Sequence, residues 1–165
     1  MSLTSGLRRR LARLLAVTAA MLFVTSLAAA PAHAALGPPQ PVSMQLRAYT
    51  STGVEYLVGR VVGTIQFDDA NTAYNLSLTV CRQSSYVSPN VRVFVNGAYA
   101  GYFAGEDGTP RPSICPGHGM SGVINGTFTT GGTVQNVSIT ITGLFFNGST
   151  ATEKSKSAFY DNPFN

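Results

Sequence analysis

After residue 41, apolar residues recur at every second position, a spacing typical of β-strands. Residues 42–49 carry apolar side chains at positions 42, 44, 46 and 48, and residues 74–81 carry them at positions 74, 76, 78 and 80. Val54–Phe67 is a third such stretch, and its Gly59 and Gly63 indicate a bulge or a tight bend. Windows of about 11 residues or more in this region show no helical repeat. The pattern predicts an all-β domain.

A hairpin is predicted at Asn96-Gly97, the strongest short-range signal for a two-residue turn between strands. The predicted cross-strand pairs are Val95 with Ala98, Phe94 with Tyr99, Val93 with Ala100 and Val91 with Tyr102. This register places the valines on one face of the hairpin and the aromatic pair Phe94–Tyr99 on the opposite face.

A second hairpin is predicted at Gly131-Gly132. Its predicted pairs are Phe128 with Gln135, Ile124 with Ile139 and Gly122 with Ile141. This register gathers most of the apolar residues on one face. Ala104–Gly119, between the two hairpins, is rich in Gly and Pro and predicts a long irregular loop. Asn147–Ser157 is polar and is interpreted as a turn, and Ser157–Phe164 as a last short strand.

About eight strands separated by regularly spaced turn signals predict an antiparallel β-sandwich, either Ig-like or jelly-roll-like. A barrel is the less favoured alternative. Cys81 and Cys115 are the two cysteines of the chain. An even pair in an exported protein predicts one disulfide, with two buried thiols as the alternative.

Residues 1–34 show the three zones of a secretory signal peptide. Four arginines between residues 8 and 13 precede the uncharged run Leu14–Ala30, and Pro31-Ala32-His33-Ala34 matches a signal-peptidase site. The run of 17 residues is short for a membrane span, which needs about 20 apolar residues. We expect cleavage after Ala34, an extended leader over residues 35–41 and one domain over residues 42–165. The mature protein would be secreted and extracellular.

The positive charge of the whole chain comes from this N-terminal segment. The chain has 11 Lys and Arg against 7 Asp and Glu, a formal net charge of +4. Four of the basic residues and none of the acidic ones precede residue 35, so the rest of the chain carries seven of each and is formally neutral. Its charge therefore gives no reason to expect binding to nucleic acid, or to a membrane after signal cleavage.

Candidate catalytic groups are few. His118 is the only histidine after residue 34, and Ser121 lacks the strand-to-helix setting of a nucleophile elbow. A small secreted hydrolase using His118 stays an alternative, because catalytic triads assemble from distant positions. One histidine and a paired set of cysteines cannot make a zinc site, and Asp68, Asp69 and Asn71 are interpreted as a turn rather than a calcium site. No metal or cofactor is predicted.

Two surface features point to binding instead. Phe94 and Tyr99 would form an exposed aromatic platform suited to sugar rings, unless another strand or loop covers them. The loop Thr109–Cys115 offers Arg111 and could enter a protease cleft, although Pro112 makes a substrate-like scissile bond unfavourable. The leading hypothesis is a non-catalytic binding module for an extracellular glycan, cell-wall material or protein. A secreted protease inhibitor is the alternative.

The succession of Gly63–Asp69, Tyr74–Cys81, Val91–Val95, Cys115 and a closing hairpin resembles a broad class of small secreted β-sandwich proteins from high-GC Gram-positive bacteria. The resemblance covers most of the chain after residue 34. It implies a fold and an extracellular location, and it assigns no function to any residue.

Overall fold

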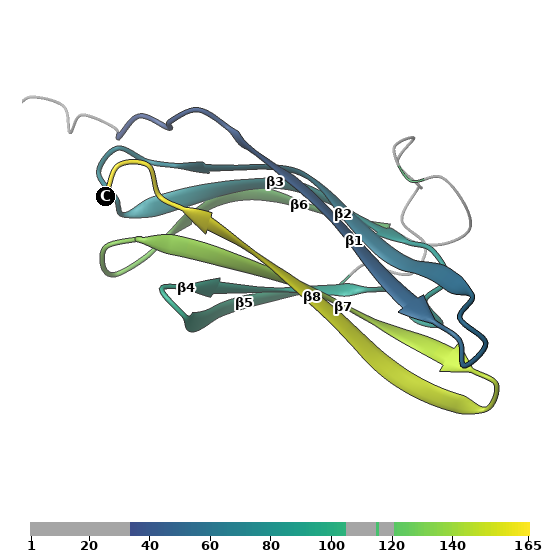
Figure 1. Cartoon of the computed structure of the whole chain (residues 1–165). Helices are drawn as coiled ribbons and strands as arrows, with labels where there is room; N and C mark the ends of the chain where they lie inside the picture. Colours follow the sequence, from purple (N-terminus) through teal and green to yellow (C-terminus); the bar gives the residue numbers. More distant parts are fainter. Residues whose placement is uncertain (1–33, 105–114, 116–120) are drawn as a thin grey trace, which may run out of the picture. The chain divides into compact units, whose positions relative to one another are not determined.

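Eight β-strands make up the protein in the computed structural model, which describes residues 34–104, 115 and 121–165. In chain order they are β1 (Gln40–Tyr49), β2 (Glu55–Phe67), β3 (Ala73–Arg82), β4 (Asn90–Val95), β5 (Ala98–Ala104), β6 (Ser121–Thr129), β7 (Asn136–Asn147) and β8 (Thr150–Asp161). They form two antiparallel sheets of four, ordered β1-β2-β3-β6 and β5-β4-β7-β8 (Figure 1). No helix occurs among these described residues. The predicted all-β fold of about eight strands is confirmed.

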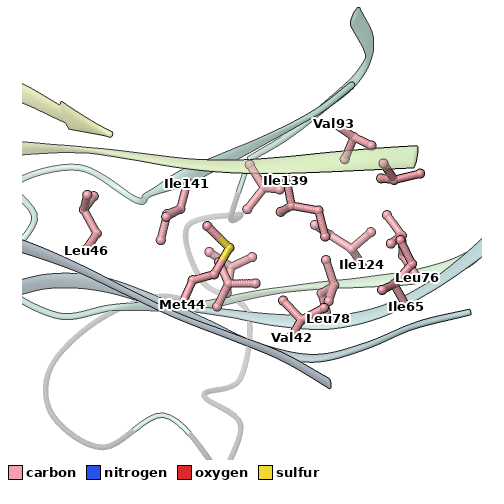
Figure 2. Packing of buried hydrophobic residues seen from close by; sticks show 14 of the residues in the cluster. Val42, Met44, Leu46, Ile65, Leu76, Leu78, Val93, Ile124, Ile139 and Ile141 are labelled. Atoms are coloured by element: carbon pink, nitrogen blue, oxygen red, sulfur yellow. The ribbon is translucent and has the colours of Figure 1, made fainter. Parts of the chain in front are cut away.

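The two sheets pack face to face around an apolar core. The first sheet contributes side chains such as Met44 and Leu78, and the second contributes Val93, Ile139 and Ile141, which point toward them (Figure 2). The predicted alternation along β1 is confirmed, because positions 42, 44, 46 and 48 are each at most 2% exposed. Burial of each Val, Leu, Ile or Met side chain contributes about 1.5–3 kcal/mol, so this core is the main source of stability.

The Asn96-Gly97 hairpin is confirmed at its turn and corrected beyond it. Both residues have positive φ values, 50° and 82°, as a type I′ turn requires. The pairs Val95–Ala98 and Phe94–Tyr99 are present, but Val93 lies opposite Gly101 and Val91 opposite Phe103. The predicted pairs Val93–Ala100 and Val91–Tyr102 are wrong, because a β-bulge leaves Ala100 as an extra residue in β5. The bulge turns Phe103 toward the core and leaves Tyr102 on the outer face, 51% exposed.

The predicted Gly131-Gly132 hairpin is wrong, because β6 and β7 belong to different sheets. Ile124 lies opposite Leu78 of β3, and Ile139 lies opposite Val93 of β4, so the predicted pairs of Phe128 with Gln135, Ile124 with Ile139 and Gly122 with Ile141 do not form.

Two contacts hold the connection between β6 and β7 where the chain passes from one sheet to the other. Val134 is fully buried and its amide donates to the Asn71 carbonyl at 2.7 Å. The Asn96 side-chain oxygen accepts from the amides of Gln135 and Asn136 at 2.8 and 3.2 Å. These tertiary contacts outweigh the local turn preference of the two glycines.

The polar segment after Phe146 is mostly strand rather than turn. The loop between β7 and β8 has two residues, Gly148 and Ser149, with Gly148 at φ 65°. A glycine with positive φ at the first central position is typical of a type II′ hairpin turn. β8 then pairs with β7 over its whole length, from Thr150 to Asp161. The expected turn over residues 147–157 is therefore wrong. The last strand predicted over Ser157–Phe164 is present, but it begins at Thr150 and ends at Asp161. β8 is polar because it is an edge strand with little buried surface.

The bulge predicted from the glycines of the second strand is confirmed. The β1–β2 register shifts between Leu46 and Arg47, where Val58 is the extra residue beside Gly59. At the other end of the β1–β2 pair, β1 begins at Gln40, so it includes the last two residues of the segment 35–41 that was predicted as an extended leader.

The predicted disulfide is also confirmed, and it joins Cys81 in β3 to Cys115. The other residues of the predicted loop, 105–114 and 116–119, lie outside the described residues.

Asp68 organises the turn between β2 and β3. Its carboxylate accepts hydrogen bonds from the amides of Thr72 and Ala73 at 2.8 and 2.7 Å, and from the Thr72 hydroxyl at 2.8 Å. Burial by itself raises the pKa of Asp68, but these hydrogen bonds outweigh it and hold the pKa below its usual value. The interpretation of this segment as a turn is confirmed, because both carboxylate oxygens of Asp68 accept hydrogen bonds from Thr72 and Ala73 at the end of the turn.

We expect Asp68→Ala to lower the free energy of unfolding by about 2 kcal/mol at pH 7, because two turn amides lose their acceptor. A carboxylate with a lowered pKa stabilises the fold above the ordinary Asp pKa of about 4, and this contribution is lost as the pH falls through the folded-state pKa. The difference in free energy of unfolding between Asp68→Ala and the unmodified protein should therefore become smaller in strong acid. Urea denaturation at neutral and at strongly acidic pH measures the difference, with Glu153→Ala, which removes an exposed carboxylate of β8, as the control. A stability difference that stays constant at all pH values would contradict the stabilising role of the ionised Asp68 carboxylate.

Candidate functional site

A row of aromatic side chains crosses the outer face of sheet β5-β4-β7-β8. The strand register places Tyr99 of β5 opposite Phe94 of β4, Phe94 opposite Ser138 of β7, and Ser138 opposite Phe159 of β8. The neighbours of these residues on β4 and β7, such as Val93 and Ile139, are fully buried in the core. Because side chains alternate along a strand, the four residues of the row all face outward. Tyr99, Phe94 and Phe159 are called the outer-face row below.

The outer-face row is open to solvent. Tyr99 is 61% exposed and Phe159 is 75% exposed, while Phe94 is half-buried. Phe94 and Tyr99 meet edge to face, with ring centroids 5.8 Å apart and an interplanar angle of 71°. Ser138 is only 7% exposed although it faces outward, as expected when large rings flank it on both sides. Strands lie about 4.8 Å apart, so the row extends about 14 Å across the sheet.

A second, polar row runs beside the first. Tyr102 lies opposite Arg92, Arg92 opposite Thr140, and Thr140 opposite Ser157. The hydroxyls of Thr140 and Ser157 are hydrogen-bonded at 2.7 Å. The face therefore offers flat apolar rings next to hydroxyl groups and one guanidinium group. Such a surface can contact the apolar face of a sugar ring while hydrogen-bonding to hydroxyls at its edge.

The structure brings together the two aromatic residues singled out from the sequence and adds Phe159 and Tyr102. Phe159 was missed because its strand was interpreted partly as a turn. The Gly148-Ser149 signal could have revealed that hairpin, and Asn147–Thr150 pairing would then have put Phe159 opposite Ser138. Tyr102 was missed because nothing local in the sequence marks the bulge at Ala100.

The described part of the surface is hollowed in at least two places. One, of about 230 Å³, lies beside Tyr99 between the β4–β5 hairpin and the β6–β7 connection. Another, of about 390 Å³, lies where the β1–β2 turn, the β3–β4 connection and the β7–β8 turn come together. The larger one is called the end hollow below, and four of its lining residues are aromatic: Tyr56, Tyr86, Phe145 and Phe146.

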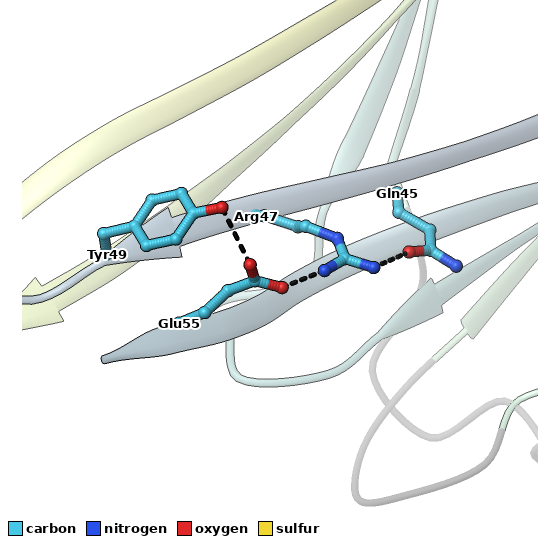
Figure 3. Close-up of polar contacts among 4 residues, drawn as sticks. All are labelled: Gln45, Arg47, Tyr49 and Glu55. Atoms are coloured by element: carbon cyan, nitrogen blue, oxygen red, sulfur yellow. Dashed lines mark hydrogen bonds and ion pairs between the residues drawn. The ribbon is translucent and has the colours of Figure 1, made fainter. Parts of the chain in front are cut away.

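A cluster of polar and titratable groups lies on β1 and β2 (Figure 3). The Tyr49 hydroxyl donates to Glu55 Oε2 at 2.7 Å, Arg47 pairs with Glu55, and Arg47 Nη2 donates to Gln45 Oε1 at 2.5 Å. The hydrogen bond between Tyr49 and Glu55 raises the pKa of Tyr49 and lowers the pKa of Glu55. Tyr49 is thus protonated and Glu55 ionised at neutral pH, so the pair does not exchange a proton there. The exposed cluster is an ion-pair network rather than an acid–base pair.

The other sequence-based candidates remain predictions. Arg111 of the proposed inhibitory loop and His118 of the proposed hydrolase lie outside the described residues. Among the residues that the structure does describe, no group of three or more His, Cys, Asp or Glu side chains could hold a metal ion. Within the same part of the chain, no helix is long and apolar enough to cross a membrane.

Comparisons with known proteins give no relative from which a function could be transferred. No protein-family model matches the chain, and neither the curated proteins nor the solved structures contain a match. The outer-face row and the end hollow are the candidate binding surfaces among the described residues.

Proposed function

We propose that the protein is a secreted, non-catalytic module that binds a neutral extracellular polysaccharide through the outer face of sheet β5-β4-β7-β8. The observation that carries this proposal is the alignment of Tyr99, Phe94 and Phe159 in one cross-strand row. Three aromatic rings in line across four strands form an extended platform rather than an isolated exposed residue. A platform that runs across all four strands of the sheet suits the internal sugar units of a long polymer better than its end.

Packing alone gives no reason for this exposure. Aromatic side chains stabilise a fold when they are buried, and large apolar patches on a soluble protein usually mark an interaction site. Phe159 is 75% exposed at an edge strand, where a polar residue would serve the strand equally well. The rings therefore fit a ligand outside the domain better than a role in the domain's own packing.

The chemistry of the face favours a carbohydrate. Sugar rings present apolar C–H faces and polar edges, and the outer-face row and its neighbouring hydroxyl row match these two surfaces. The row itself contains no charged residue. Arg92 lies in the row on one side, and the exposed Asp161, opposite Asn136, lies in the row on the other side, so the two flanking charges have opposite sign. Backbone pairing on both sides holds Phe94 in place before binding, which lowers the entropic cost of association.

Export is part of the proposal. The signal-peptide pattern of residues 1–34 predicts secretion, and the Cys81–Cys115 disulfide is consistent with an oxidising compartment. Outside the cell, an insoluble polymer is a target that suits a surface exposed across four strands and uncharged along its aromatic row.

The test is a pull-down of the purified protein on insoluble neutral polysaccharides and isolated cell walls. We expect retention on at least one matrix, and about 30-fold weaker binding for Tyr99→Ala combined with Phe159→Ala, because each ring contributes about 1 kcal/mol or more. Both residues are exposed, so the variant should fold normally, and Phe94 stays because it is half-buried. The control is Tyr49→Ala, which removes an exposed tyrosine from the other sheet.

Two results would count against the proposal. Unchanged retention of the double variant would show that the outer-face row is not the contact surface. Absence of retention on every polysaccharide and cell-wall matrix would exclude a glycan as the ligand and favour a protein partner.

A further inference from the structure

The end hollow is built from three segments far apart in the sequence. Tyr56 comes from β2 of one sheet, Phe145 and Phe146 come from β7 of the other, and Tyr86 comes from the connection between β3 and β4. The hollow measures about 390 Å³, which is within the usual range of about 300–1,000 Å³ for ligand pockets.

Two ring pairs shape its sides. The rings of Tyr56 and Phe145 lie 5.4 Å apart at 39°, and Phe145 is only 6% exposed. The rings of Tyr86 and Phe146 meet edge to face, 4.8 Å apart at 67°. Tyr86 is 65% exposed and Tyr56 is 40% exposed, so each pair offers ring surface to solvent. The hollow therefore contains ring surface on both sides.

The segment that carries Tyr86 is firmly held. The amides of Gln83 and Ser85 donate to the Val58 carbonyl of one sheet, and the Tyr86 amide donates to the Leu144 carbonyl of the other at 2.9 Å. The buried Ser85 hydroxyl bonds both to the amide and to the carbonyl of Leu144.

Arg82 fixes the same segment from outside. Its guanidinium donates to the carbonyls of Ser85 and Tyr86 at 2.7 and 2.8 Å. The backbone at Tyr86 is thus anchored to both sheets before any ligand arrives, and a preorganised site loses less entropy on binding.

The polar part of the lining consists of hydroxyl and amide groups. Thr50, Ser84 and Asn147 contribute polar groups to the lining, and none of the described lining residues is charged. Aromatic rings with a few neutral hydrogen-bonding groups suit a neutral, ring-shaped and hydroxyl-bearing ligand. The described lining residues offer no charge to pair with an anionic or cationic ligand, and the nearby Arg82 guanidinium is bonded to the carbonyls of Ser85 and Tyr86.

We infer that the end hollow binds a short neutral saccharide of one to a few rings, as a second carbohydrate site distinct from the outer-face row. Tyr86 and Tyr56 supply the stacking surfaces, and Asn147 supplies hydrogen bonds to sugar hydroxyls. None of the lining residues belongs to the outer-face row, so the inference holds whether or not that face binds a polymer.

The experiment follows backbone amide shifts by NMR while soluble neutral trisaccharides are added to the purified protein. The probes are cellotriose, maltotriose and N-acetylated chitotriose, with N-acetylphenylalaninamide as the apolar aromatic comparison. The titrations use the variant Tyr99→Ala with Phe159→Ala, so binding at the outer face does not contribute. We expect one trisaccharide to give saturable shifts at Tyr56, Tyr86 and Asn147.

Two further substitutions assign the contacts. Tyr86→Ala should weaken trisaccharide binding about 10-fold or more, as expected for an aromatic anchor. Asn147→Ala should also weaken it several-fold, because a sugar uses the amide and an apolar ring does not. Tyr102→Ala, which removes a tyrosine 51% exposed on β5, should leave the affinity within about twofold.

The inference is overturned if no trisaccharide gives saturable shifts at the hollow at millimolar concentrations. It is also overturned if only the aromatic amide binds there, or if Asn147→Ala and Tyr86→Ala bind the trisaccharide as tightly as their parent. Loss of polymer retention at the outer face with intact trisaccharide binding would separate the two sites.

Discussion

Replacing Gly63 by alanine should lower the free energy of unfolding by about 3 kcal/mol or more. Gly63 lies in β2 with φ at 148°, a conformation that residues with a side chain rarely adopt. A Cβ atom there would lie 1.9 Å from the Ser77 carbonyl oxygen and 2.9 Å from the Leu78 Cα. Both atoms belong to the backbone of the neighbouring strand β3, so they cannot move aside without disturbing the β2–β3 pairing.

Urea denaturation of the purified variant measures this effect. Gly132→Ala is the matched control, because a Cβ at Gly132 meets nothing within 4 Å and its φ is not positive. We expect the control to stay within about 1 kcal/mol of the unmodified protein, on either side. A Gly63→Ala variant as stable as the Gly132→Ala variant would show that β2 and β3 do not approach each other this closely.

Removing the disulfide should cost about 4 kcal/mol, because the Cys81–Cys115 bond closes a loop of 34 residues in the unfolded chain. Alanine is the better replacement at both positions, since Cys81 and Cys115 are 0% and 3% exposed and a serine hydroxyl would be buried there. The double alanine variant should unfold at lower urea concentration than the native protein.

Reductant provides the control for this prediction. Reduction should destabilise the native protein toward the level of the double alanine variant, while the variant itself should not respond. Non-reducing mass spectrometry should show Cys81 linked to Cys115, with the protein two hydrogen atoms lighter than its reduced form. Equal stability of the native protein and the variant would mean that the loop is already constrained in the unfolded state.

Local sequence patterns were sufficient to predict the structure wherever the conformation of a segment depends on its own residues. Alternation of apolar residues marks the strands because a strand exposes successive side chains to opposite faces, and the buried positions of β1 and β3 follow it. Asn96-Gly97 specifies its turn because both residues tolerate positive φ. The cysteine pair predicts the disulfide because two cysteines allow one intramolecular partnership.

The remaining strand pairings and side-chain positions depend on contacts between segments that are far apart in the sequence. Gly131-Gly132 resembles a hairpin turn, yet buried Val134 and the Asn96 side chain direct the chain into the other sheet. The face of Tyr102 depends on a bulge that only the pairing of β5 with β4 defines. The outer-face row depends on two further registers, β4 with β7 and β7 with β8.

The sequence by itself determined the strand-rich fold class, the Asn96-Gly97 turn, the disulfide and the aromatic pair Phe94–Tyr99. Only the tertiary structure decided that Phe159 continues this pair across the sheet and that Tyr56 and Tyr86 meet at the end hollow. The physical reason is that strand pairing and sheet packing are non-local. Many partners satisfy the same alternation, and the choice among them depends on the packing of the whole core.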